Sequence, residues 1–321
     1  LRGVDLQADA ETRLDVIGVA AAGRPFDGAV GAGQCVRILT GAPVPEGADT
    51  VVMQERVTRE DDAAIIAVGQ KPGQHVRQAG EDIARGAVAL AAGAVLLPAA
   101  LGMLASVGVG EVNVRRRARV AFFSTGDELR RVGEPLGAGQ IYDSNGYTIH
   151  GMLTRAGVEI VDMGLVRDDP ADIENAFADA AARADAIVTS GGVSVGDADY
   201  VKDTLDKTGS VGFWRVAMKP GRPLAFGRVG DALFFGLPGN PVSAMVTYYQ
   251  LVQPALRALA GLPDAGPPLT VTAVSSEGLR KKTGRREFQR GVLTRDADGR
   301  LVVSRAGHQG SGELSSMNAA N

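Results

Sequence analysis

Between residues 118 and 262 the sequence alternates short apolar runs with amphipathic stretches of helical length, and this alternation constrains the fold most strongly. Strands are expected at residues 119–123, 158–162, 186–190, 224–227 and 232–235, and helices at residues 143–157, 170–184, 201–207 and 241–261. Alternating strands and helices build βαβ units, which place strands in a parallel sheet with helices on its faces. We therefore expect a three-layer α/β domain with a parallel-rich sheet.

The expected helix at residues 143–157 carries the clearest signals of a start and an end. Its apolar face consists of Ile149, Met152, Leu153 and Ala156. These residues recur at spacings of three, four and seven, which is the helical period. Asp143, Ser144 or Asn145 is suited to cap the first turn, and Gly157 is suited to end the last one.

The sequence on either side of this domain favours strands. Residues 14–68 contain short apolar runs divided by glycine and proline, with strands expected at 16–20, 35–39, 50–53 and 65–68. A helix is expected at 98–108, and the basic run 115–119 is interpreted as a solvated domain boundary. Residues 263–268 have the composition of a linker, and strands are expected beyond it at 269–274, 288–294 and 301–305 with a turn at Asp298-Gly299. The predicted domains are an N-terminal β-rich domain (1–85), a linking helical and β segment (86–117), the α/β domain (118–262) and a small β-barrel-like C-terminal domain (263–321).

Composition excludes several classes of protein. A net charge of −3 argues against a general nucleic-acid-binding surface. Cys35 is the single cysteine, so an internal disulfide is impossible, which fits a reducing compartment. No apolar run approaches the ~20 residues that span a bilayer, so no membrane partner is expected. Because the chain begins at Leu1 rather than at methionine, we expect a preceding segment.

Three glycine-rich polar loops follow expected strands, at residues 124–128, 190–197 and 236–241. In an open parallel sheet, ligands bind beyond the carboxyl ends of the strands. Backbone N–H groups in such loops approach anions closely, so a phosphate-bearing ligand is the natural occupant. Carboxylates gather at the same edge, namely Asp127, Glu128, Asp197 and Asp199. Carboxylates together with phosphates suit magnesium and acid–base chemistry, although Asp127 could simply cap a helix.

A basic loop follows in the sequence, with Arg215 before it and Lys219 and Arg222 within it. Pro220 and Pro223 stiffen this loop, so its cations are suited to an oxyanion, the alternative being an exposed basic turn. Other sites are excluded by the sequence. The glycine loops lack the lysine and hydroxyl ending of a P-loop, the three histidines are scattered, and no histidine lies near the serines as a base.

Five strings resemble the molybdenum-insertase family, which includes the bacterial enzyme and the E domain of gephyrin and its plant relatives. Residues 190–200 (SGGVSVGDADY) resemble its molybdopterin-binding signature, and residues 237–243 (LPGNPVS) are similar to its second signature. Residues 40–49 (TGAPVPEGAD), 80–83 (GEDI) and 124–129 (STGDEL) match further motifs in the family order. The resemblance runs nearly from end to end.

The resemblance implies a function. Members of this family take adenylylated molybdopterin and molybdate, release AMP, and insert molybdenum into the dithiolene with the help of Mg²⁺. They are cytoplasmic homodimers whose active site is shared between subunits, and contacts with the molybdopterin adenylyltransferase and with apo-molybdoenzymes are expected.

The same resemblance assigns roles to residues. Catalytic residues would be Thr40, Asp82, Glu128, Asp199 and Lys219, with Asp82 reaching from the partner subunit. The pterin phosphate would be held by Gly191, Gly192, Ser194, Pro238, Gly239, Asn240 and Pro241. Molybdate would meet Lys219, Arg222, Ser243, Ser311 and Arg285, where the choice between Arg285 and Arg286 is open. The metal would be held by Glu128 and Asp199.

Two departures from the family pattern stand out. The family's aspartate-glycine-tyrosine-alanine motif would lie before Leu1, and position 222 is arginine where many relatives carry lysine. The charge is retained there, so function is expected to survive. A scaffold protein, a stand-alone adenylyltransferase and a nucleotide-binding domain of other use are the alternatives. The flanking β domains and the Lys219 loop argue against the adenylyltransferase, and the lack of a fused second catalytic domain argues against the scaffold.

Overall fold

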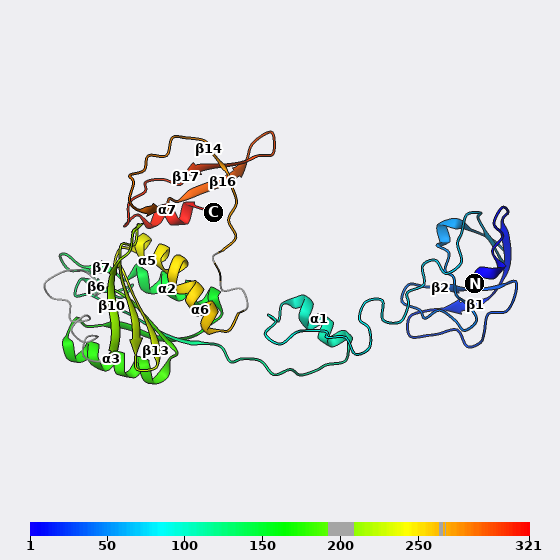
Figure 1. The fold of residues 1–321 in the computed structure, drawn as a ribbon, viewed down its shortest axis with the longest axis horizontal. Coiled ribbons are helices and arrows are strands. Elements are labelled where there is room, and N and C mark those ends of the chain that lie inside the picture. Colours follow the sequence, from blue (N-terminus) through cyan, green and yellow to red (C-terminus); the bar gives the residue numbers. More distant parts are fainter. Residues whose placement is uncertain (192–208, 263–265, 267) are drawn as a thin grey trace. The chain divides into compact units, whose positions relative to one another are not determined.

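The computed structural model describes residues 1–191, 209–262, 266 and 268–321. The chain divides into two compact units, Leu1–Ala89 and Leu90–Asn321, and each is built around its own interior (Figure 1). The expected helix at 201–207 lies outside the described residues. The domain boundaries predicted from the sequence stay a prediction.

The unit Leu1–Ala89 contains a four-stranded sheet in the order β2-β1-β4-β3. Its strands are β1 (Thr12–Ala20), β2 (Gln34–Ile38), β3 (Val57–Glu60) and β4 (Ala63–Ile66), with short 3-10 turns at Gly3–Asp5 and Gln54–Arg56. Strand β1 runs parallel to β2 and antiparallel to β4. Leu14, Cys35 and Ile66 pack together beneath this sheet.

The prediction of a strand at 50–53 is wrong. A strand that was not predicted, β3, follows a few residues later. The backbone of residues 50–53 bonds to loops instead of a strand, because Thr50 N donates to the Leu1 carbonyl and Val51 N to the Gln74 carbonyl. Strand β3 was missed because it is an edge strand whose side chains are largely exposed, so its sequence lacks the apolar alternation of a half-buried strand.

The unit Leu90–Asn321 is built on a six-stranded sheet in the order β10-β12-β13-β9-β5-β8. The strands are β5 (Arg119–Thr125), β8 (Glu159–Val166), β9 (Ala186–Ser190), β10 (Gly209–Arg215), β12 (Pro223–Val229) and β13 (Ala232–Leu237). Strands β13, β9, β5 and β8 run parallel, whereas β10 and β12 are antiparallel to their neighbours. The parallel-rich sheet that the sequence predicts is therefore confirmed, with β10 and β12 as its antiparallel part. The short turn between β12 and β13 can only join antiparallel strands, because a parallel crossover needs a dozen or more residues.

Helices cover both faces of this sheet, so the three-layer α/β fold is confirmed (Figure 1). The helices α2 (Ser144–Ala156), α5 (Pro241–Thr247) and α6 (Gln253–Leu259) pack on one face, and α3 (Pro170–Arg183) packs on the other. Alternate residues of β5 serve the two layers, since Phe122 faces α2 and Phe123 faces α3. The Phe177 ring of α3 makes edge contacts with Phe123 and Phe234, at centroid distances of 5.3 and 5.4 Å.

Helix ends follow the capping residues read from the sequence. Asp143 precedes α2, and its Oδ1 accepts a hydrogen bond from Gly146 N at 2.9 Å. Gly157 ends the helix in the left-handed conformation at φ 72°. The helix expected over 241–261 runs as a continuous helical segment from Pro241 to Leu259, with a π turn at Tyr248–Val252 shortly before Pro254. Proline lacks the N–H that would continue the helical hydrogen bonds, which accounts for the π turn.

The remaining elements are short. Helix α1 (Pro98–Ser106) begins at proline as expected. Two-stranded pairs join β6 (Leu129–Arg130) to β7 (Ile141–Tyr142), and β11 (Met218–Lys219) to β15 (Arg286–Glu287). Over the described part of the chain, the helices are too short or too polar to cross a membrane.

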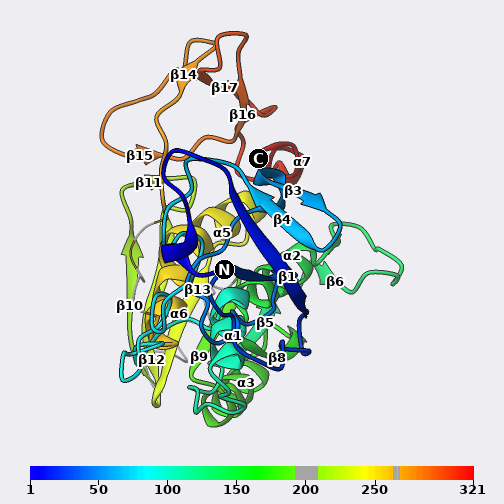
Figure 2. The ribbon, with the colours of Figure 1, turned by 90° about the vertical axis from the view of Figure 1, so that its right-hand side faces the viewer.

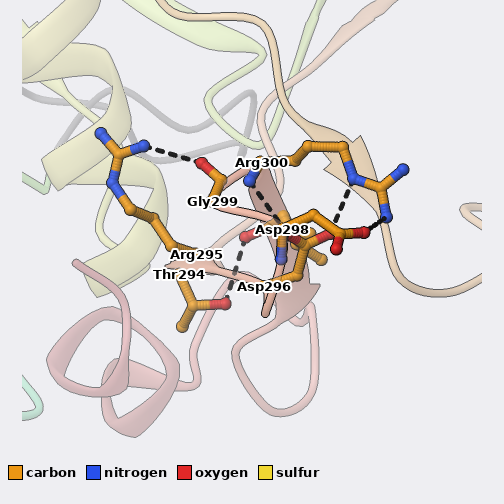
Figure 3. Close-up of polar contacts among 7 residues, drawn as sticks. Thr294, Arg295, Asp296, Asp298, Gly299 and Arg300 are labelled. Atoms are coloured by element: carbon orange, nitrogen blue, oxygen red, sulfur yellow. Dashed lines mark hydrogen bonds and ion pairs between the residues drawn. The ribbon is translucent and has the colours of Figure 1, made fainter.

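The C-terminal region contains a three-stranded sheet of β14 (Val274–Ser275), β17 (Leu301–Arg305) and β16 (Gly291–Arg295), followed by α7 (Leu314–Ala319) (Figure 2). The hairpin turn at Asp298-Gly299 is confirmed. Asp296 Oδ1 accepts hydrogen bonds from the backbone of Asp298 and Arg300, and its Oδ2 binds the Arg300 guanidinium (Figure 3). The strand expected at 269–274 is wrong except at Val274, because residues 269–273 have no strand partner. Helix α7 was not predicted.

Two residues of the basic run at 115–119 bind the carboxylate of Asp185. The Arg116 guanidinium makes two bonds to Asp185, at 2.6 and 2.7 Å, and Arg119 N donates to the same carboxylate at 2.8 Å. These donors lower the pKa of Asp185 to about 2, and the Arg116 side chain is the largest cause. The linking segment is thereby tied to the start of β9.

This pair gives stability that depends on pH. The folded pKa of Asp185 lies below the ordinary 3.8, so its stabilisation is present above pH 4 and is lost as the pH falls towards 2. We expect Asp185→Asn to lower the urea midpoint at pH 6, and we expect its difference from the wild type to shrink between pH 4 and pH 2. Asp172→Asn, an exposed change in α3, serves as the control. A difference that stays constant over this pH range would contradict the assignment.

Candidate functional site

Loops from three parallel strands meet at the carboxyl edge of the six-stranded sheet, as the sequence predicts. Asn145, in the first turn of α2, joins two of them, because its Nδ2 donates to Ser190 Oγ at 2.6 Å and to the Gly239 carbonyl at 2.8 Å. The Gly191 backbone N–H also donates to the Leu237 carbonyl. The loop after β9 is thus bound to the loop after β13.

Gly191 brings the third loop into this contact. It adopts φ 90°, which side-chain-bearing residues rarely adopt, and a Cβ at this position would collide with the Thr125 carbonyl oxygen at the end of β5. Only glycine allows the loops after β9 and β5 to approach this closely. Gly192, Ser194, Asp197 and Asp199 lie outside the described residues.

Unpartnered polar atoms lie buried beneath these loops. Ser124 Oγ in β5, Thr189 Oγ1 in β9 and Asn145 Oδ1 have no hydrogen-bond partner among the residues that the structure describes. A buried polar group without a partner is destabilising by about 1–3 kcal/mol, and such groups are uncommon outside functional sites. Their concentration at one edge marks this place as one that receives further polar groups.

A carboxylate cluster lies at the same edge. Asp127 and Glu128 follow β5, and Asp168 follows β8. Burial raises the pKa of Asp168, and the charges of Asp127 and Glu128 raise it further, although the Thr125 hydroxyl partly offsets this by hydrogen bonding. Asp168 was missed by sequence reasoning, because only the loops rich in glycine were considered. Reading the residues after β8 as well would have found it.

The oxygen donors of this cluster have the chemistry that Mg²⁺ prefers, and Mg²⁺ commonly takes only one or two carboxylates together with substrate phosphates. Within the described ranges, no three acidic, histidine or cysteine side chains lie close enough to hold an ion by themselves. The residues present therefore fit a metal that a phosphate helps to bind.

Lys219 lies at the end of β11, which runs parallel to β15 (Figure 2). Its Nζ contacts Glu287 Oε1 at 2.8 Å. Beside this pair is a cavity of about 270 Å³, whose lining consists of Lys219, Arg280, Lys281, Lys282, Arg285 and Glu287. Arg285 lines the cavity and Arg286 does not, which supports Arg285 in the choice that the sequence left open.

The other predicted molybdate residues lie around the start of α5. Ser243 is buried in α5, and the Ser311 carbonyl accepts a hydrogen bond from Val242 N at 3.0 Å. Neither serine lines the cavity beside Lys219. Arg222 is exposed, and its carbonyl accepts a hydrogen bond from Val216 N. Asn240 precedes α5, and Pro241 is its first residue.

Arg290 is a further residue that sequence reasoning did not weigh. It is only 5% exposed, and its guanidinium donates to Ser316 Oγ at 3.0 Å and to the carbonyls of His308 and Gly310 at 3.0 and 2.8 Å. These bonds fix the backbone directly before Ser311 and tie it to α7, while the Ser311 carbonyl itself is bound to Val242 of α5. The residue is the last arginine of the string at 285–290, of which only the first two arginines had been considered.

The loop of Lys219 also rests on α5. Gly221 adopts φ 92°, and a Cβ there would lie 2.5 Å from Thr247 Oγ1 and 3.2 Å from Met218 Cε. Helix α5 therefore supports both the loop after β13 at its N-terminus and the Lys219 loop along its side.

Thr40 and Asp82 belong to the unit Leu1–Ala89. Thr40 lies two residues after β2 and is exposed, and Asp82 is exposed in the turn that follows Gly80. Their predicted roles stay predictions.

Asn145 offers a direct test of the loop junction. Asn145→Ala removes two hydrogen bonds and leaves Ser190 Oγ and the Gly239 carbonyl without this donor, so we expect the free energy of unfolding to fall by about 1–3 kcal/mol. Urea denaturation measures this change. Asn175→Ala, an exposed change in α3, should lower it by less than about 0.5 kcal/mol. Equal effects of the two substitutions would contradict the role of Asn145.

The fold and the site together define a class of protein, namely an α/β protein with glycine-containing loops and carboxylates at the carboxyl edge of its sheet and a basic cavity in the same unit. Comparisons with known proteins agree. Residues 121–258 match the family described as "Probable molybdopterin binding domain", residues 3–108 match "MoeA N-terminal region (domain I and II)", and residues 272–321 match "MoeA C-terminal region (domain IV)".

Individual relatives are also similar. The chain is 46% identical to the molybdopterin molybdenumtransferase of Haemophilus influenzae, over 96% of this chain and 76% of that protein. It is 39% identical to the one of Nostoc, over 87% of this chain and 65% of that protein, so it spans slightly less than two thirds of this relative. A crystal structure of the molybdopterin biosynthesis moeA protein from Pyrococcus horikoshii superposes with a TM-score of 0.81 at 28% identity, covering 100% of this chain and 79% of that one. The chain belongs to the molybdopterin molybdenumtransferase family, whose members act in molybdenum-cofactor biosynthesis.

Proposed function

We propose that this chain carries out the family reaction, in which molybdenum from molybdate enters adenylylated molybdopterin and AMP is released. The observation that supports this most is the meeting of three loops and a carboxylate cluster at one sheet edge, with the Lys219 loop seated on the same helix as one of those loops. A phosphoanhydride ligand and an oxyanion are the substrates that such an arrangement suits.

The glycine loops are proposed to hold the phosphates of the pterin substrate. Gly191 and Gly239 let a phosphate approach the backbone closely, because glycine presents no side chain there. The Gly191 N–H itself is bound to the Leu237 carbonyl. Gly192, Ser194, Pro238, Asn240 and Pro241 complete the proposed pterin-binding set, of which Pro238 is buried and Asn240 is exposed.

Molybdate is proposed to bind between the Lys219 loop and the start of α5. Lys219 and Arg222 supply positive charge to a tetrahedral dianion, and Ser243 and Ser311 supply hydroxyl groups. Arg285 adds positive charge from the position directly before β15, the strand that pairs with β11. Arg290 acts by positioning the Ser311 loop, because its own guanidinium is occupied by backbone carbonyls.

Mg²⁺ is proposed to bind at the carboxylates of Glu128, Asp168 and Asp199. When bound, it would neutralise the charge on the phosphoanhydride as the bond to AMP breaks. The carboxylates would hold the ion against the phosphates. The raised pKa of Asp168 reflects its burial and, after that, the repulsion from Asp127 and Glu128 that such a cation would relieve.

A homodimer is proposed, in which Thr40 and Asp82 of one subunit complete the site of the other. The linking segment supports this, because Leu97, Leu101 and Val107 on and beside α1 are each between 44 and 62% exposed. Apolar side chains gathered in this way mark protein–protein contacts. The cytoplasm is proposed as the compartment, supported by the free thiol of Cys35.

The test is anaerobic incubation of the full-length protein with adenylylated molybdopterin, Mg²⁺ and molybdate, without ATP. We expect AMP release that depends on molybdate, together with reconstitution of an apo-molybdoenzyme. Asp199→Asn should lose both. Binding of the pterin without AMP release or reconstitution would sink the proposed reaction.

A further inference from the structure

Glu287 contributes a carboxylate to an otherwise basic cavity lining. Among the described residues, the side chains that line this cavity are five cations and Glu287. The Glu287 side chain is 9% exposed and the Lys219 side chain is 48% exposed, and Lys219 Nζ donates a hydrogen bond to Glu287 Oε1 at 2.8 Å. The carboxylate is therefore the sheltered member of this pair, and the ammonium is the member that reaches solvent.

The backbone holds the two residues beside each other. Strands β11 and β15 are parallel, with Lys219 directly opposite Glu287 (Figure 2). Arg286 N donates to the Ala217 carbonyl and Phe288 N to the Lys219 carbonyl, both at 2.8 Å. Residues that are opposite each other in a sheet project their side chains to the same face, so the pairing of the strands itself brings the two charges together.

Glu287 is held in its ionised form. The hydrogen bond from Lys219 is the largest influence and keeps the pKa of Glu287 below its usual range, although burial opposes it. The charge of Lys219, the side chain of Gln289 and the charge of Lys281 lower this pKa further. A negative charge therefore stands in the cavity lining at neutral pH.

Neither anion attraction nor stability accounts for a carboxylate at this position. A negative charge among five cations weakens the attraction that the cavity exerts on an anion. A partly exposed ion pair contributes little to stability. The pair does restrict the side chain of Lys219, because lysine is a point charge on a flexible stem that otherwise samples many positions.

We propose that Glu287 is a positioning residue, which holds the Lys219 ammonium at one place in the cavity lining and offsets part of the positive charge there. Glu287 acts through Lys219 and is not assigned a contact with a substrate. The contact between the two side chains is independent of any activity, whereas the use of Lys219 in the reaction rests on the proposed function.

The contact is tested first by chemical labelling of the full chain. Lysines are acylated with acetic anhydride, and mass spectrometry gives the labelling rate of Lys219 relative to that of Lys282. Lys282 lines the same cavity, so this ratio corrects for the general effect of a lost negative charge. We expect Glu287→Gln to raise the ratio by about two- to fivefold, because an amine that is released from an ion pair reacts faster.

The AMP-release assay tests the consequence for the reaction, because two effects of Glu287→Gln should point in opposite directions. KM for molybdate should fall about two- to threefold, since the cavity lining becomes more positive. In contrast, kcat should fall about tenfold, since Lys219 is no longer held in place. Glu287→Asp keeps the charge on a shorter side chain, so its KM should match that of the wild type, while its labelling ratio and kcat should lie between the two. This variant also decides the matter if Glu287→Gln does not fold.

The matched control is Glu277→Gln, which breaks the contact of Glu277 with Arg305, at 2.6 Å, outside the cavity lining. It should change neither the labelling ratio nor the kinetic constants. An unchanged labelling ratio in the Glu287 variants would overturn the proposal, as would a rise in KM for molybdate or an equal loss of kcat in Glu287→Gln and Glu277→Gln. A wild type that releases no AMP would instead refute the proposed function, and the labelling ratio would then decide the role of Glu287 by itself.

Discussion

Replacing Asp168 by asparagine is expected to raise the melting temperature at pH 7 while lowering the rate of AMP release by about a hundredfold or more. The Asp168 carboxylate is partly buried beside the charges of Asp127 and Glu128, and these influences raise its pKa. Its ionised form is therefore destabilising, and asparagine has the same size without the charge. On the proposed function, the rate should fall because a carboxylate that would help to hold Mg²⁺ at the phosphates is lost.

Calorimetry and the AMP-release assay measure these two effects. Because the folded pKa is raised, the destabilisation disappears as the pH falls through it, so the difference in melting temperature should narrow on acidification. Mg²⁺ should raise the melting temperature of the wild type more than that of the variant. Asp231→Asn, an exposed change in the turn between β12 and β13, is the matched control. Identical melting temperatures of wild type and Asp168→Asn at pH 7 would show that the carboxylates do not repel one another.

Replacing Phe177 by alanine is expected to lower the free energy of unfolding of the α/β unit by about 3–5 kcal/mol. The ring is fully buried between α3 and the sheet, where it contacts Phe123 and Phe234 edge-on. Its removal leaves a cavity that the three-layer packing cannot close, because Phe123 and Phe234 are fixed within paired strands.

The comparison for Phe177 is Phe226→Ala, since Phe226 is 43% exposed and its ring contacts that of Phe235 in a tilted arrangement, at a centroid distance of 5.1 Å. We expect this change to lower the free energy of unfolding by about 1 kcal/mol. Urea denaturation followed by circular dichroism measures both. A smaller effect for Phe177 than for Phe226 would mean that the α3 face is not the main interior of the unit.

The sequence predicted those helices and strands whose own residues mark them, by burial or by capping. Strand β9 was bounded correctly because all five of its residues are buried, and its apolar start at residues 186–188 leads directly into the polar glycine-rich loop that ends it. The bounds of α2 followed from Asp143 and Gly157, because capping depends on residues adjacent to the helix. Strand β3 was missed because its formation depends on pairing with β4 and not on its own apolar residues. Strand β10 was likewise missed, and it too lies at a sheet edge.

Some features of the site could likewise be predicted from the sequence, and others could not. The meeting of the glycine loops could be foreseen, because parallel strands place their carboxyl ends at one edge. The clamp at Asn145 could not, since an asparagine near a helix start is equally a capping residue, and only the packed structure shows its side chain turned to Ser190. Arg290 was missed because a buried arginine cannot be told from an exposed one by sequence alone. The predicted molybdate set stays a prediction, with Lys219 and Arg285 lining the basic cavity and Ser243 buried in α5.

The seating of Gly221 on Thr247 bears on both of the substrate sites that we propose. Helix α5 begins at the loop that is proposed to hold the pterin phosphate, and the same helix supports the loop of Lys219 through Gly221. On that proposal, one helix would set the separation between the nucleotide-bearing and the oxyanion-bearing ends of the reaction. If binding of the first substrate tilts α5, the second site moves with it, so the order in which the two substrates arrive can be controlled by the position of one helix.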